Sequence, residues 1–172
     1  MSEWEGLLRL GLAVGLGGVI GFERATLDKG AGMRTHMLVC LGSALFMVCS
    51  LLLVELFDDG AAVSQVDPTR IASTIVTGVG FLGAGLIFRN EHKVMGLTTA
   101  AGIWVAAAVG MSVGAGLYIT AIGGAVLTLL VLAVMHRVEI MLDLKSDREH
   151  LDRNLPGSED DGARTQDAEP AH

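Results

Sequence analysis

The residues that could do chemistry lie at the edges of long apolar runs, and the first group is Asp67-Pro68-Thr69-Arg70. Asp67 can accept hydrogen bonds from the free amides at a helix start, and proline is favoured at the first helical position. An acidic side chain there also suits the positive end of the helix dipole. The pattern therefore predicts a helix cap at Asp67. A functional role remains the alternative, because Arg70 needs an acidic partner and Asp67 is one of the candidates.

A second group is divided between the end of one apolar run and the start of the next. Glu23-Arg24 closes the first run, and Arg34-Thr35-His36 opens the second. An ion pair between Glu23 and Arg34 across the short connecting loop is expected. Charges at a membrane interface are common, so a structural role is the favoured interpretation. The alternative is a pH-sensing or ion-linked role for His36, because an unperturbed histidine titrates near pH 6.5.

Hydroxyl side chains form a third group. It includes Thr98 and Thr99, which lie at the start of another apolar run. Hydroxyls in membrane helices usually bond to a carbonyl one turn back, which favours a structural role here too. The sequence has no nucleophile elbow, no phosphate-binding loop, no His-Glu-x-x-His and no pair of carboxylates inside an apolar run. It therefore predicts no enzyme activity, no metal site and no cofactor.

The composition indicates a membrane protein. The 172 residues are 51% hydrophobic and only 18% charged, which leaves too little polar surface for a soluble domain of this size. The net charge of −7 is concentrated after residue 136, where ten acidic and five basic residues lie. No basic patch favours a nucleic-acid partner.

Charge-free intervals predict five transmembrane helices. The interval between Lys93 and His136 has 42 residues, about 63 Å as one helix, against about 30 Å for the hydrocarbon core, so it must cross twice. The first span is the weakest and requires Arg9 to extend its charge to the interface. The fold class is an all-α integral membrane protein, a bundle of five transmembrane helices. The spans are expected near 6–22, 35–57, 70–88, 97–113 and 116–136.

Lysine and arginine in the loops predict the orientation. They are concentrated in the loops 23–34 and 89–96 and after the fifth span, whereas the fourth loop has none. By the positive-inside rule the N-terminus is outside and the C-terminus is cytoplasmic. The acidic start of the chain also lacks the charge pattern of a cleaved signal peptide, so the first span is expected to be retained.

Glycines within the spans predict close helix packing, because small residues let backbones approach one another in lipid. The third span is expected to be central in the bundle and contacted on several sides. The alternative is a flexible or broken helix that lines a cavity, as in transporters. The glycines assigned to helix packing are Gly78, Gly80, Gly83, Gly85, Gly110 and Gly114.

The chain after the fifth span divides into two parts. Residues 137–155 carry apolar side chains at helical spacing, which predicts a cytoplasmic juxtamembrane helix. Residues 156–172 have almost no apolar side chains and are expected to be a disordered acidic tail. The transmembrane domain is thus expected over residues 1–136.

Four blocks in this order resemble the MgtC/SapB family of bacterial inner-membrane proteins. The blocks are "GFER" (21–24), "GMRTHMLVCLGSALF" (32–46), "DPTRIASTIVTGVGFLGAGLIFR" (67–89) and "GLTTAAGIWVAAAVGMSVGAGLY" (96–118), and the match covers about residues 5–136. The resemblance implies five spans with the C-terminus inside, and a multi-pass location in the inner membrane. Longer members carry a C-terminal domain of the ACT type. Only 36 residues follow His136, so a short form lacking that domain is expected.

Two functions from different classes follow. The resemblance implies a non-enzymatic modulator of other membrane systems in adaptation to low magnesium or acid stress, associated with virulence in pathogens. Its partners would be the lipid bilayer and other inner-membrane proteins, with a homo-oligomer left open. The alternative is a transporter or channel for Mg²⁺ or another cation, which prefers oxygen ligands. The runs 35–54, 71–88 and 94–135 contain no acidic residue, so the sequence favours the modulator.

Overall fold

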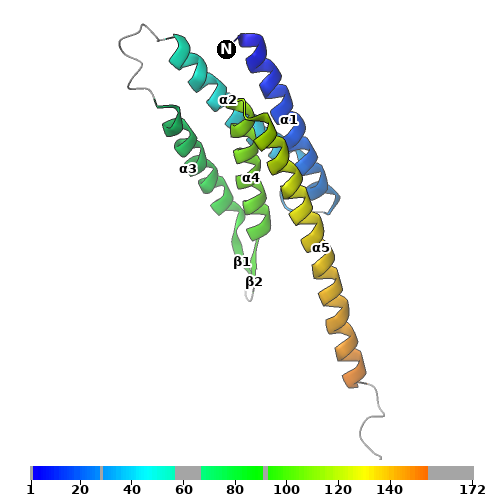
Figure 1. Cartoon of the computed structure of the whole chain (residues 1–172). Helices are drawn as coiled ribbons and strands as arrows, with labels where there is room; N and C mark the ends of the chain where they lie inside the picture. Colours follow the sequence, from blue (N-terminus) through cyan, green and yellow to red (C-terminus); the bar gives the residue numbers. More distant parts are fainter. Residues whose placement is uncertain (1, 28, 57–66, 91–92, 155–172) are drawn as a thin grey trace, which may run out of the picture. The chain divides into compact units, whose positions relative to one another are not determined.

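The described chain forms five α-helices and one short β-hairpin (Figure 1). The computed structural model describes residues 2–27, 29–56, 67–90 and 93–154. Each helix is long and apolar enough to cross a membrane, which confirms the predicted five-span helical membrane protein. The elements are α1 (Glu3–Thr26), α2 (Met33–Leu56), α3 (Pro68–Leu86), β1 (Phe88–Asn90), β2 (Lys93–Met95), α4 (Leu97–Gly114) and α5 (Tyr118–Asn154).

The hairpin between α3 and α4 occupies a stretch that the sequence predicted to be the end of a span and a loop. β1 and β2 pair antiparallel, with Phe88 opposite Met95. Gly96 then has a φ of 86° and leads into α4. A side chain at Gly96 would collide with the carbonyl oxygen of Leu86, so glycine is required where the hairpin returns to the end of α3.

The turn between α4 and α5 lies in the glycine-rich stretch 111–118, where the sequence predicts it. Gly116 has a φ of 82°, and its amide donates to the carbonyl of Val113 at 2.9 Å. The next amide, of Leu117, donates to the carbonyl of Ser112 at 2.8 Å. These two bonds form a Schellman motif, which ends α4 and satisfies carbonyls that the helix leaves free.

The chain divides into two compact units, residues 1–131 and 132–172. The first unit contains α1 to α4, the hairpin and the first turns of α5. In the second unit the described residues continue α5 to Asn154. The stretch predicted as a juxtamembrane helix, 137–155, is helical up to Asn154 as a continuation of α5, and no glycine or proline interrupts the chain between residues 125 and 154. The predicted disordered tail, 156–172, lies outside the described residues.

The centre of the first unit is α2, which is packed between α1 and α4. Gly17 and Gly21 of α1 face it: a Cβ at Gly17 would lie 2.7 Å from the carbonyl oxygen of His36. Gly114 of α4 faces it from another side, where a Cβ would lie 2.7 Å from the carbonyl oxygen of Ala44. Backbones in contact at such distances form the close packing that holds helices together in lipid.

The prediction that the third span is central is wrong for the single chain. α3 packs against α4 and α2 along one face, through Ile75, Val79 and Gly83. Nothing lies within 4 Å of a Cβ built at Gly78, Gly80 or Gly85, although Gly110 and Gly114 of α4 are in close contact with α2. The glycines of α3 therefore leave open surface rather than close packing within one copy.

Candidate functional site

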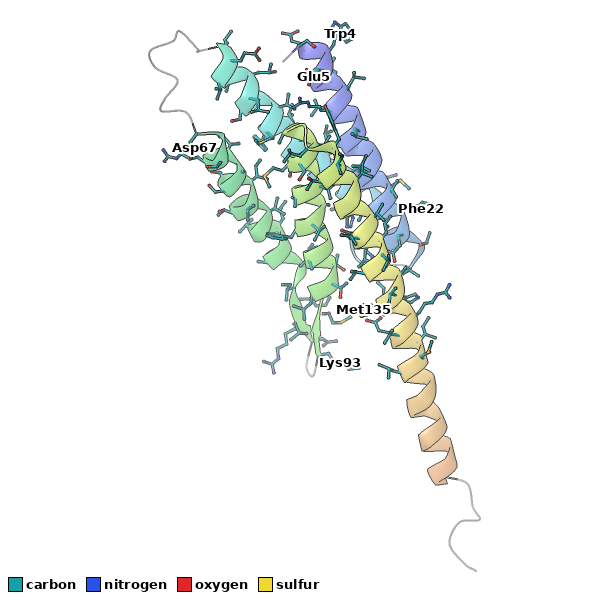
Figure 2. All side chains as sticks on the ribbon, viewed as in Figure 1. Trp4, Glu5, Phe22, Asp67, Lys93 and Met135 are labelled. Atoms are coloured by element: carbon teal, nitrogen blue, oxygen red, sulfur yellow. The ribbon has the colours of Figure 1, made fainter. Side chains whose placement is uncertain are left out.

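The candidate residues lie at two opposite ends of the first unit. Figure 2 shows Trp4, Glu5 and Asp67 at one end and Lys93 at the other. The second end, here called the basic end, holds the start of α2, the hairpin and the start of α4. Its exposed cations are Lys29, Arg34, Arg89 and Lys93.

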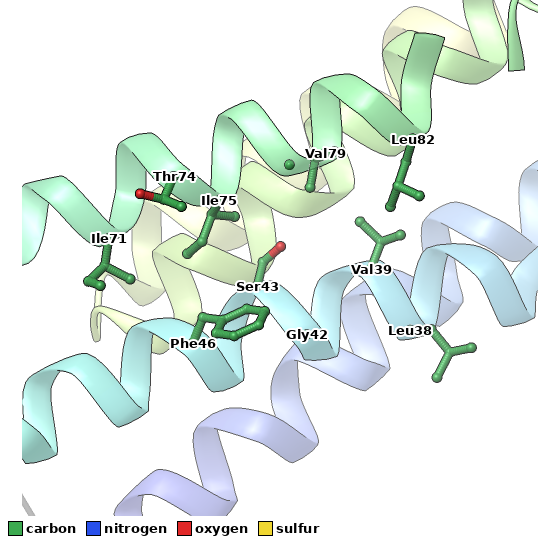
Figure 3. Close-up of a pocket in the computed structure, with 11 residues that line it drawn as sticks. Leu38, Val39, Gly42, Ser43, Phe46, Ile71, Thr74, Ile75, Val79 and Leu82 are labelled. Atoms are coloured by element: carbon green, nitrogen blue, oxygen red, sulfur yellow. The ribbon is translucent and has the colours of Figure 1, made fainter. Parts of the chain in front are cut away.

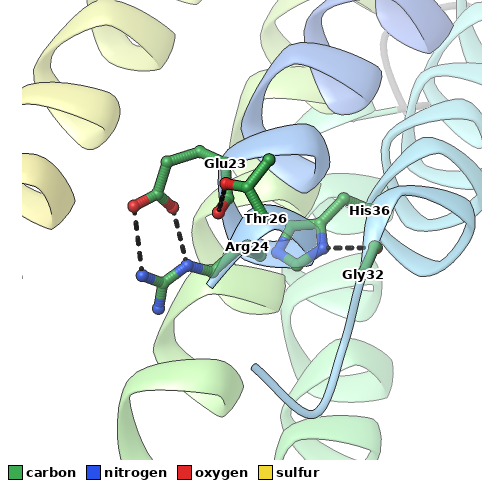
Figure 4. A network of polar contacts seen from close by, with 5 residues as sticks. All are labelled: Glu23, Arg24, Thr26, Gly32 and His36. Carbon is green, nitrogen blue, oxygen red and sulfur yellow. Dashed lines mark hydrogen bonds and ion pairs between the residues drawn. The ribbon is translucent and has the colours of Figure 1, made fainter. Parts of the chain in front are cut away.

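A buried polar cluster lies at the basic end (Figure 4). The Arg24 side chain is 3% exposed and donates to Glu23 from two nitrogens, Nε to Oε2 at 2.8 Å and Nη2 to Oε1 at 3.3 Å. A two-bond pair of this kind fixes the guanidinium in one orientation. The end of α1 thus carries a rigid, paired cation rather than a mobile one.

His36 is the fully buried member of this cluster. Its Nδ1 donates to the carbonyl of Gly32 at 3.0 Å, because a carbonyl can only accept. Its Nε2 has no hydrogen-bond partner among the described residues and faces α4, where a Cβ at Gly102 would lie 3.4 Å away. The missing side chain at Gly102 leaves room for the imidazole ring between α2 and α4.

The expected ion pair between Glu23 and Arg34 is wrong. Glu23 pairs with its neighbour Arg24, whose guanidinium is held beside it on the same helix turn. Arg34 and Thr35 are exposed at the start of α2, directly before the buried His36. Within the described ranges Arg34 forms no ion pair, so its charge faces the surroundings of the bundle.

Asp67 caps α3 as the sequence predicts. Its Oδ1 accepts from the backbone amide of Thr69 at 2.9 Å and from the Thr69 hydroxyl at 2.7 Å, and Pro68 takes the first helical position. These hydrogen bonds, with a further contribution from the charge of Arg70, hold the pKa of Asp67 below its ordinary value. Among the described residues Asp67 and Arg70 form no direct ion pair.

The lowered pKa of Asp67 makes the start of α3 sensitive to acid. The folded state favours the ionised carboxylate, so this stabilisation is complete above the unfolded pKa of about 3.9 and is lost as the pH falls through the lower folded value.

Asp67→Ala is expected to speed hydrogen exchange at the first amides of α3 at pH 7, and Asp67→Asn to speed it less, because asparagine also caps. Equal exchange in both variants and the unchanged protein would contradict the cap.

The remaining predicted residues, Thr98 and Thr99, lie at the start of α4, at the basic end. Thr99 is buried on α4, whereas Thr98 is exposed beside it. Ser73 and Thr77 of α3 donate to the carbonyls of Arg70 and Ser73, at 2.8 and 3.0 Å. They are exposed, and their hydroxyls are satisfied by their own helix, as expected for a hydroxyl in lipid.

Arg9 is a site that the sequence did not assign. It donates to the carbonyl of Gly114 at 2.7 Å and pairs with Glu5, one turn earlier on α1. Its guanidinium also lies 5.8 Å from the ring centre of Tyr118. A cation at the carbonyl end of α4 suits the helix dipole. Arg9 therefore binds the α4–α5 turn to α1. The sequence did not reveal this contact, because Arg9 and Gly114 are far apart in the chain.

An apolar groove of about 640 Å³ runs between α2 and α3 (Figure 3). Figure 3 shows Phe46 and Val39 of α2 directed toward Ile75 and Leu82 of α3. Two glycines, Gly42 and Gly78, line the groove, and nothing lies within 4 Å of a Cβ built on either. The groove therefore exists because both helices lack side chains there. It is called the α2–α3 groove below.

Among the described residues no group of three or more histidine, cysteine, aspartate or glutamate side chains could hold a metal ion. The described carboxylates of the first unit lie at helix ends: Glu3, Glu5, Glu23, Glu55 and Asp67.

Comparison with known proteins places these features in a family. YhiD of Escherichia coli (strain K12) is 50% identical over 140 residues, covering 80% of this chain and 64% of YhiD. Protein MgtC of Brucella abortus (strain 2308) is 47% identical over 119 residues, 69% of this chain and 45% of MgtC. Protein SrpB of Synechococcus elongatus is 40% identical over 159 residues, 87% of this chain and 86% of SrpB.

The chain thus spans less than two thirds of the length of YhiD and of Brucella MgtC. No solved structure matches. The model of the MgtC family matches residues 10–141, which include α1 from Leu10 onward, all of α2 to α4, and all but the last residue of the apolar span of α5, Tyr118–Leu142. The chain is a multi-pass membrane protein that belongs to the MgtC family.

Proposed function

We propose that this chain is a non-enzymatic protein of the bacterial inner membrane that acts by binding other membrane proteins. In line with the family resemblance, the binding modulates those proteins in adaptation to low magnesium or acid stress. The basic end faces the cytoplasm in this proposal, because cytoplasmic loops are enriched in lysine and arginine.

The observation that carries the proposal is the outer face of α3, made of Ser73, Thr77, Gly80 and Ala84. All four are exposed, and they lie on the side of α3 that is turned away from α2 and α4. Small residues and hydroxyls in this spacing are typical of a helix face that packs against another membrane helix. A lipid-facing surface gains nothing from lacking side chains, so a protein partner accounts for this face better.

The name of YhiD favours a second candidate function, because it proposes magnesium transport. Mg²⁺ prefers oxygen ligands and gives up its water reluctantly. A conduction path through this chain would have to use backbone carbonyls or residues of several copies, because the described carboxylates of the first unit lie at helix ends. Binding of a partner needs no such path, and we prefer it for that reason.

A photo-crosslinking amino acid at Thr77 tests the proposal in bacterial membranes. We expect a crosslink to a second membrane protein, identified by mass, that is reduced at least several-fold by Gly80→Leu. Leucine at position 80 would fill the outer face without touching the rest of the chain, because nothing lies within 4 Å of a Cβ there.

The matched control is Gly123→Leu on α5, which is equally exposed and equally free of neighbours. It should leave the Thr77 crosslink unchanged. Crosslinks only to lipid, or a loss that is equal in both leucine variants, would contradict binding through this face. Crosslinks only to another copy of the chain would replace the proposed partner with a homo-oligomer.

A further inference from the structure

The depth of the α2–α3 groove matches one leaflet of a bilayer. On α3 its lining runs from Ile71 to Leu82, about 16 Å of helix, against about 15 Å for half of the hydrocarbon core. Its volume of about 640 Å³ lies within the range of pockets that hold small molecules. In a membrane an acyl chain is therefore an occupant of the right length and polarity.

The groove lies closer to the basic end than to the other end of α2. Its lining on α2 begins with Leu38, five residues after the helix starts, and stops at Phe46, ten residues before the helix ends. Arg34 lies one turn before Leu38, on the same face of α2. An acyl chain in the groove would therefore bring its headgroup near Arg34.

The other wall of the groove is α3, and further cations follow it in the chain. α3 ends at Leu86, and the hairpin that follows carries Arg89 and Lys93. Ala31, just before α2, and Leu86, the last residue of α3, belong to one apolar cluster, and the hairpin begins two residues after Leu86. Successive strand residues face opposite sides, so Arg89 and Lys93 place a cation on each face of the hairpin.

These cations have no acidic partner within the part of the chain that the structure describes. Arg34, Arg89 and Lys93 are all exposed. An arginine fork suits a phosphate group, and a basic cluster at the membrane surface attracts anionic lipids. An apolar groove with exposed cations at one end is complementary to an anionic phospholipid and not to an uncharged apolar molecule.

We propose that the α2–α3 groove binds an acyl chain of an anionic phospholipid, whose phosphate is held by Arg34 and one of the two hairpin cations. The lipid fills the space left by Gly42 and Gly78 and supplies the contacts between α2 and α3 that side chains do not. This site is separate from the outer face of α3, and it stands whether or not that face binds a partner protein.

Native mass spectrometry of the full chain tests the proposal. The protein is released from vesicles that contain phosphatidylglycerol and phosphatidylcholine in equal amounts and with the same acyl chains. We expect phosphatidylglycerol adducts to dominate. Arg34→Gln with Arg89→Gln should reduce that preference, by about fivefold for each cation. Arg137→Gln, which removes an exposed charge outside the first unit, should leave it unchanged.

Two leucine variants of α3 test whether the lipid binds in the groove or elsewhere on this helix. Gly78→Leu places a side chain in the groove and should remove most bound lipid, whereas Gly80→Leu lies outside it and should not. Both sites are free of neighbours, so both variants should fold. Equal adducts of the two lipids, or equal retention in the two leucine variants, would overturn the proposal. A dimer that only Gly78→Leu dissociates would assign the groove to a second copy instead.

Discussion

Gly110→Leu is expected to prevent the bundle from assembling, with the largest loss of stability of any single substitution proposed for this chain. A Cβ at position 110 would collide with the carbonyl of Cys40 and would lie 2.9 Å from the Cys40 Cα, both of them backbone atoms of α2. Backbone atoms cannot turn aside as a flexible side chain can. The helices α2 and α4 must therefore separate, along a contact that continues to Gly102 and Gly114.

Overpacking of a close-packed interior costs about 1–3 kcal/mol and sometimes more. The expected readout is a lower unfolding temperature of the purified protein, or its loss as a monodisperse peak on size exclusion. Gly123→Leu is the matched control, because the same leucine on α5 enters open space. If the two variants had the same unfolding temperature, α2 and α4 would not be in backbone contact at position 110.

Arg9→Met is expected to release the α4–α5 turn from α1. The substitution removes the hydrogen bond to the Gly114 carbonyl and the ion pair with Glu5, but it keeps an apolar side chain of similar length. Hydrogen bonds to charged groups contribute about 1.5–3 kcal/mol, and this one also satisfies a carbonyl at the end of α4. Arg9→Lys should be intermediate, because an ammonium group lacks the planar fork of arginine.

Hydrogen exchange gives the local readout for this prediction. The amides of Gly116 and Leu117 should exchange faster in Arg9→Met, while those in the middle of α2 change less. Arg137→Met serves as the control, because it removes an exposed arginine that takes no part in the turn. Unchanged exchange at the turn in Arg9→Met would contradict the structural role of Arg9.

The number and positions of the spans could be predicted from the sequence, because uncharged length alone decides whether a segment can cross a bilayer. The sequence could not predict which helix is central in the bundle. The glycines of α3 suggested a helix contacted on several sides, but α2 holds that place with Gly42 as its one glycine. A central helix needs small residues on its neighbours, and Gly17 of α1 and Gly110 of α4 supply them.

Local polar chemistry was predicted better than long-range pairing. The cap at Asp67 involves Thr69, two residues away, so the local sequence is enough to predict it. The contact between Arg9 and Gly114 joins residues 105 positions apart, and no local pattern indicates it. For Glu23 the choice between Arg24 and Arg34 depended on where the chain turns after α1, which charge patterns do not reveal.

Magnesium flux is the measurement that tests the proposed function most directly. The purified, monodisperse chain is inserted into liposomes that contain an internal magnesium indicator, and its folding and orientation are verified before Mg²⁺ is added outside. The proposal predicts no flux above that of empty liposomes. Flux above that background would contradict the proposal and make this chain a magnesium transporter, provided that Gly123→Leu leaves the flux intact.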